Sequence, residues 1–78
     1  MTNLEKYTNT FVETFKIEAN KIEDLKYQAI LAWDSVGHMT LIAALEETFD
    51  IMMDTDDIIN LSSFEKGKEI VAKYGVEF

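Results

Sequence analysis

Apolar side chains recur along this chain at the three- and four-residue steps of amphipathic α-helices, and little of the sequence shows the alternation typical of strands. The first stripe consists of Leu4, Tyr7, Phe11 and Phe15. Thr2 and Glu5 stand at the positions of a capping box, which predicts where this helix begins. The sequence therefore indicates a helix across the first 15 residues.

A second stripe predicts the central helix, which begins at Ser35 and ends near Asp50. Its apolar members are Val36, Met39, Ile42, Leu45 and Phe49. Residues 16–33 lie between the two helices and mix polar residues with apolar ones that pin a long loop to the core, namely Ile17, Ile22, Leu25, Tyr27 and Ile30. A loop this long is unusual in a small domain, which indicates either a functional role or a short hidden helix.

The C-terminal third predicts one short and one longer helix. Asp54 is placed to cap a short helix that carries Ile58 and Ile59. Ser62 and Glu65 form a capping-box pattern before the last stripe, and Gly75 is placed to end that helix. The stripe comprises Phe64, Ile70, Val71 and Tyr74. We expect an all-α fold, a small four-helix bundle with three longer helices, one short helix and a long first loop, forming a single domain over residues 1–78.

Composition narrows the possible functions. Seven basic residues against fifteen acidic ones give a net charge of −8, which disfavours nucleic acid and anionic membranes and favours partners with basic surfaces. There is no cysteine, so any thiol chemistry has to be brought in. The N-terminal segment does not resemble a signal peptide, and no apolar run is long enough to span a membrane. We expect a cytoplasmic monomer without a metal site.

Ser35 stands at the predicted start of the central helix, in the sequence WDSVGHM. Backbone N–H groups lack partners there and the helix dipole is positive, so a phosphate attached to Ser35 would be stabilised. The simpler interpretation is that Ser35 only caps the helix.

Asp34-Ser35-Val36, the run LIAALEETFD from Leu41, and the acidic segment from Asp54 resemble the acyl carrier protein family. The resemblance is strongest from Trp33 to Phe64 and implies the acyl-carrier type of four-helix bundle. It implies that Ser35 carries 4′-phosphopantetheine, whose thiol holds an acyl group as a thioester, and that Asp34 helps a phosphopantetheinyl transferase to recognise the site. It also implies docking of enzymes that load and transfer the acyl group, through basic patches, onto Val36, Met39, Glu46, Glu47, Asp50, Asp56, Asp57 and Ile59.

Departures from the family pattern bear on the pathway. Val36 replaces the usual leucine, and Gly37 and Thr40 occupy positions that are often acidic in carriers of fatty-acid synthesis. A carrier for a specialised lipid, polyketide-like or surface-polysaccharide pathway is therefore favoured. A D-alanyl or other aminoacyl carrier is an alternative.

Two other classes of protein are compatible with the sequence. A small acidic adaptor could bind a partner through an apolar helix face, with Ser35 acting only as a cap. A hydrolase could use His38, three residues after Ser35, as a base, although the chain is far too short for the usual nucleophile-elbow architecture. We expect a carrier that is not itself an enzyme.

Trp33 either shields the attached arm or closes the loop onto the bundle, and Met39, Met52 and Met53 are candidates for a deformable core.

Overall fold

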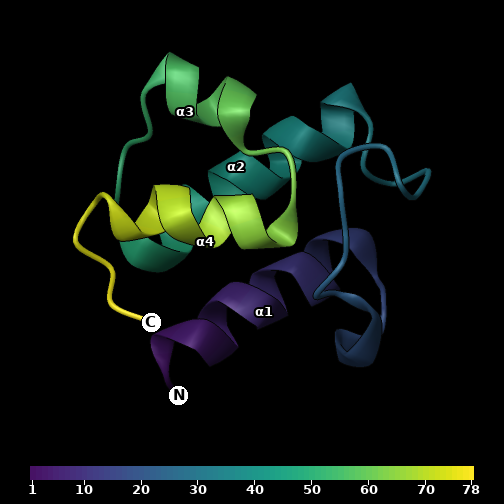
Figure 1. The fold of residues 1–78 in the computed structure, drawn as a ribbon, viewed down its shortest axis with the longest axis horizontal. Helices are drawn as coiled ribbons and strands as arrows, with labels where there is room; N and C mark the ends of the chain where they lie inside the picture. The colour runs from purple at the N-terminus through teal and green to yellow at the C-terminus, as the bar shows by residue number, and fades with distance from the viewer.

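The computed structural model describes all 78 residues and contains four α-helices, one short 3₁₀ helix and no β-strand. The helices are α1 (Asn3–Phe15), η1 (Ala19–Lys21), α2 (Ser35–Phe49), α3 (Thr55–Asn60) and α4 (Phe64–Ala72). α4 crosses in front of α2, α1 runs below both in this view, and α3 lies at the opposite end of the molecule from the two termini (Figure 1). The expected all-α fold with four α-helices is confirmed. None of these helices is both long and apolar enough to cross a bilayer.

The helix boundaries follow capping chemistry. The predicted capping box of α1 is present, with the Thr2 hydroxyl accepting from Glu5 N–H and the Glu5 carboxylate accepting from Thr2 N–H. At α4 the prediction was one residue early, because Ser63 rather than Ser62 accepts from Lys66 N–H.

The C-terminal end of α4 also differs from the prediction. The helix ends at Ala72, and Gly75 lies beyond it in the following turn, with a φ of 92°. Lys73 N–H bonds to the Ile70 carbonyl and Tyr74 N–H to the Val71 carbonyl, each three residues back, so the regular α-helix ends before the glycine.

The core is dominated by aromatic rings. Trp33 is fully buried, stacks on Phe15 and meets the edge of Phe11. This settles its role: the indole closes the first connection onto α1. The buried apolar residues are Tyr7, Phe11, Phe15, Ile22, Leu25, Trp33, Leu41, Ile42, Leu45, Met53, Leu61, Phe64, Ile70 and Val71. Leu4 of the first predicted stripe is instead 42% exposed.

The long first connection is ordered by buried side chains and by backbone hydrogen bonds. It contains the short helix that its length suggested, η1. Farther along, Phe64 N–H donates to the Leu25 carbonyl over 2.9 Å, and Tyr27 N–H donates to the Ser62 carbonyl over 2.8 Å. These two bonds attach the connection to the segment between α3 and α4.

A polar cluster attaches α3 to the end of α4. The Asp57 carboxylate lies 2.6 Å from Lys73 Nζ and accepts a hydrogen bond of 2.5 Å from the Tyr74 hydroxyl. The same hydroxyl accepts from Asp54 N–H over 2.9 Å. The hydrogen bond from Lys73, followed by that from Tyr74, lowers the pKa of Asp57, and the bond to Asp57 raises the pKa of Lys73.

Candidate functional site

Ser35 is the first residue of α2 and is not its cap. The Asp34 carboxylate accepts a hydrogen bond of 2.8 Å from Gly37 N–H, and Asp34 has the extended backbone of an N-cap residue. This resolves the prediction that Ser35 lies at the cap or in the first turn: it lies in the first turn. The serine hydroxyl is therefore not required for capping.

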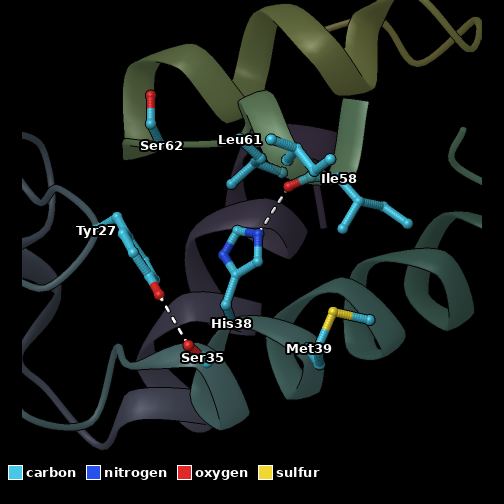
Figure 2. A pocket seen from close by; sticks show the side chains of 8 residues that line it. Tyr27, Ser35, His38, Met39, Ile58, Leu61 and Ser62 are labelled. Atoms are coloured by element: carbon cyan, nitrogen blue, oxygen red, sulfur yellow. Dashed lines mark hydrogen bonds between the residues drawn. The ribbon is translucent and has the colours of Figure 1, made fainter. Parts of the chain in front are cut away.

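The Ser35 side chain is exposed and makes one hydrogen bond, of 3.2 Å, to the Tyr27 hydroxyl (Figure 2). The backbone N–H groups of Ser35 and Val36 have no acceptor within the protein. These two N–H groups lie at the positive end of the α2 dipole. A phosphate group on Ser35 Oγ would thus meet free donors, and the residues present fit a phosphodiester at this position.

A pocket of about 350 Å³ opens beside Ser35, between α2 and α3. Figure 2 shows Tyr27 and Ser35 on one side of it, Met39 on the other, and the α3 residues above. Its lining is mostly apolar and consists of Tyr27, Ser35, His38, Met39, Ile58, Ile59, Leu61 and Ser62. A more open groove runs along α2 on the other side of Ser35, past Val36, Met39, Thr40 and Ala43.

His38 lines this pocket and links three segments of the chain. Its Nδ1 accepts a hydrogen bond of 3.0 Å from the Trp33 indole, and its Nε2 lies 2.7 Å from the Ile58 carbonyl oxygen (Figure 2). Both ring nitrogens are therefore engaged, and neither is bonded to Ser35. The hydrogen bond that a serine–histidine dyad requires is not made.

The predicted docking residues fall into two groups. Val36, Met39 and Ile59 are 75%, 54% and 70% exposed, and all three lie beside Ser35 on the pocket or the groove. The acidic residues Glu47, Asp50 and Asp56 are exposed as well. These six residues are open to a partner.

Two acidic residues of the predicted docking set accept hydrogen bonds from other parts of the protein. Asp57 is only 7% exposed and is held by Lys73 and Tyr74, so its assignment to the docking surface is wrong. Glu46 is half-buried, and one of its carboxylate oxygens accepts from Met53 N–H over 2.8 Å. Of the three methionines considered for the core, only Met53 is buried.

Tyr27 and Leu61 line the pocket beside Ser35 although the sequence does not assign them to the site, and His38 is considered there only as the base of a hydrolase. The sequence predicts Tyr27 only as an apolar anchor of the loop, and its hydroxyl reaches Ser35 because the connection folds back toward α2. No spacing rule links residues 27 and 35 across an irregular segment.

No family model matches the chain, and no curated protein or solved structure is similar enough to count as a relative.

Proposed function

We propose that the chain is an acyl carrier protein, with 4′-phosphopantetheine attached to Ser35. One observation carries the proposal: Asp34 caps α2, which leaves the Ser35 hydroxyl exposed at a helix N-terminus with two unpartnered N–H groups beside it. A serine whose only task was capping would occupy the position that Asp34 holds. The attached arm supplies the thiol that the cysteine-free chain lacks, and that thiol carries the acyl group as a thioester.

The residues around Ser35 have separate roles in this proposal. Asp34 fixes the first turn of α2 and presents a carboxylate beside the serine for recognition by a phosphopantetheinyl transferase. Val36, Met39 and Ile59 form an apolar contact surface around the attachment point. The exposed carboxylates of Glu47, Asp50 and Asp56 guide basic surfaces of the loading and transferring enzymes toward it.

The pocket supports an acyl cargo over a small aminoacyl one. Its walls are largely the apolar side chains of Met39, Ile58, Ile59 and Leu61, which would remove an alkyl chain from water. A D-alanyl group, with its ammonium charge, would gain nothing from these walls. Within acyl carriers, the neutral Gly37 and Thr40 in the first turns of α2 favour a specialised lipid, polyketide-like or surface-polysaccharide pathway.

The test is intact mass spectrometry after incubation with coenzyme A, Mg²⁺ and a broad-specificity phosphopantetheinyl transferase. We expect the wild-type chain to gain one phosphopantetheinyl group and Ser35→Ala to gain none. Ser62→Ala is the matched control, because Ser62 is exposed and lines the same pocket, and it is expected to gain one group. Far-UV circular dichroism of Ser35→Ala establishes that the helices persist.

An adaptor without a prosthetic group is the second candidate, favoured by the exposed apolar side chains of Val36, Met39 and Ile59. The two functions differ in their dependence on Ser35. A carrier loses its function in Ser35→Ala, whereas an adaptor keeps its partner. Absence of any mass gain in the wild-type chain with several transferases would overturn the carrier proposal and favour the adaptor.

A further inference from the structure

Tyr27 is the only side chain that forms a hydrogen bond to Ser35 Oγ. We infer that Tyr27 is a positioning residue for this serine: its hydroxyl orients Oγ for modification and afterwards donates a hydrogen bond to the phosphodiester. The inference rests on the proposed function and adds to it a residue outside the Asp-Ser motif, eight positions before the serine.

The phenol of Tyr27 is held in place from three directions. Its backbone N–H donates to the Ser62 carbonyl over 2.8 Å, which fixes the main chain against the α3–α4 connection. Its ring meets the Trp33 ring edge-on, with 6.2 Å between centroids, and the His38 ring in the same way at 5.4 Å. Trp33 is fully buried and His38 is bonded at both nitrogens, so these two contacts are with rings that are themselves fixed. The hydroxyl thus reaches Ser35 from a rigid support.

An oriented hydroxyl favours the transfer reaction. Ser35 Oγ attacks the phosphorus of coenzyme A that bears the pantetheine, and a new Oγ–P bond forms. The bridging P–O bond breaks, adenosine 3′,5′-bisphosphate leaves with the electron pair, and the serine proton passes to a base of the transferase. Restricting the rotation of the Ser35 side chain before the attack removes part of the entropic cost of reaching the transition state.

Modification of Ser35 fixes the direction of this hydrogen bond. In the free chain either hydroxyl can be the donor over the 3.2 Å between them. Once Oγ is esterified it has no proton, so the Tyr27 hydroxyl has to donate, either to Oγ or to an anionic phosphodiester oxygen. The second bond is charge-assisted and therefore stronger than the one it replaces. Since Tyr27 lines the pocket and not the groove past Val36 and Thr40, this bond directs the arm toward the pocket.

The experiment compares Tyr27→Phe with wild type, using Ser62→Ala as the matched control that removes a hydroxyl from the same pocket without a bond to Ser35. With coenzyme A, Mg²⁺ and one transferase, we expect Tyr27→Phe to lower kcat for the transfer about threefold to tenfold, with little change in KM. The thermal unfolding midpoint is expected to stay at the wild-type value because the ring is kept. In the loaded proteins, the ³¹P resonance of the phosphodiester is expected to shift in Tyr27→Phe and not in Ser62→Ala.

The outcomes separate this inference from the proposed function. Wild-type values of both kcat and the ³¹P shift in Tyr27→Phe would overturn the role of Tyr27 and leave the carrier proposal standing. A fall in kcat accompanied by an equal fall in Ser62→Ala, or by a lower unfolding midpoint, would also overturn it, because the effect would then be loosening of the pocket. A wild-type chain that gains no group overturns both.

Discussion

The Trp33 indole donates to Nδ1 of His38, so the imidazole proton of the neutral ring lies on Nε2 and points at the Ile58 carbonyl oxygen. The indole N–H can only donate a hydrogen bond, so Nδ1 has to be the acceptor in this pair. Ile58 lies near the end of α3, where carbonyl groups lack intrahelical partners, and no backbone N–H outside the helix bonds to its oxygen. One histidine of α2 therefore ties the first connection to the end of α3.

Replacing His38 tests this link. We expect His38→Ala to lower the free energy of unfolding by about 1–3 kcal/mol, because the buried indole N–H and the Ile58 carbonyl lose their partners. Urea denaturation followed by circular dichroism measures the change. His38→Phe keeps a ring of similar shape without either hydrogen bond, and we expect most of the loss to remain. Wild-type stability in His38→Phe would show that ring packing alone holds the three segments.

Substitutions at Asp34 and Ser35 test which of the two residues caps α2. Asp34→Ala removes the acceptor for Gly37 N–H and is expected to cost about 1 kcal/mol of unfolding free energy. Ser35→Ala removes only the bond to the exposed Tyr27 and is expected to cost less than about 0.5 kcal/mol. Chemical denaturation of both variants under one condition gives the comparison. An equal loss in the two would mean that Ser35 also caps the helix.

The sequence predicted the helices well because their apolar periodicity matches the buried faces. Tyr7, Phe11 and Phe15 all face the core, and the Thr2–Glu5 capping box is formed. The length of the first connection correctly suggested a short helix within it. Periodicity identifies a helix face, however, and not how much of that face is covered. Val36 and Met39 continue the stripe of Ile42 and Leu45 but remain exposed.

The errors in detail arise where neighbouring residues have the same local chemistry. Ser62 and Ser63 are both able to cap α4, and the choice depends on the first connection. The Ser62 carbonyl accepts from Tyr27 N–H, and Ser63 forms an isolated antiparallel bridge with Lys26. In sequence, Asp57 is also indistinguishable from the acidic residues beside it. Only the fold brings Lys73 and Tyr74 to its carboxylate.

Gly37 offers a third test, at a position whose neutrality the sequence could not explain. A Cβ atom there would lie 1.9 Å from the Ala32 carbonyl oxygen, because the end of the first connection passes directly over α2. Although alanine is the better helix former, we expect Gly37→Ala to lower the free energy of unfolding by about 1–3 kcal/mol through this clash. Thr40→Ala, one turn farther along the exposed side of α2, is expected to change it by less than about 0.5 kcal/mol. Urea denaturation measures both, and a stabilised Gly37→Ala would contradict the close approach.

Asp57 makes stability depend on pH in the acidic range. Its pKa lies below the ordinary value of 3.8, because the charged form accepts from Lys73 and then from Tyr74. The unfolded chain lacks these bonds, so the contribution of Asp57 is complete above pH 3.8 and is lost as the pH falls through the lower folded-state pKa. Asp57→Asn should therefore be less stable than wild type at neutral pH, with the difference shrinking below pH 3.8. Thermal unfolding across this range measures that difference. Glu69→Gln, which breaks an exposed contact of 3.8 Å with Lys66, is the control and should leave stability nearly unchanged. A difference between wild type and Asp57→Asn that stays constant down to the acid limit would mean that the carboxylate charge does not hold α3 to α4.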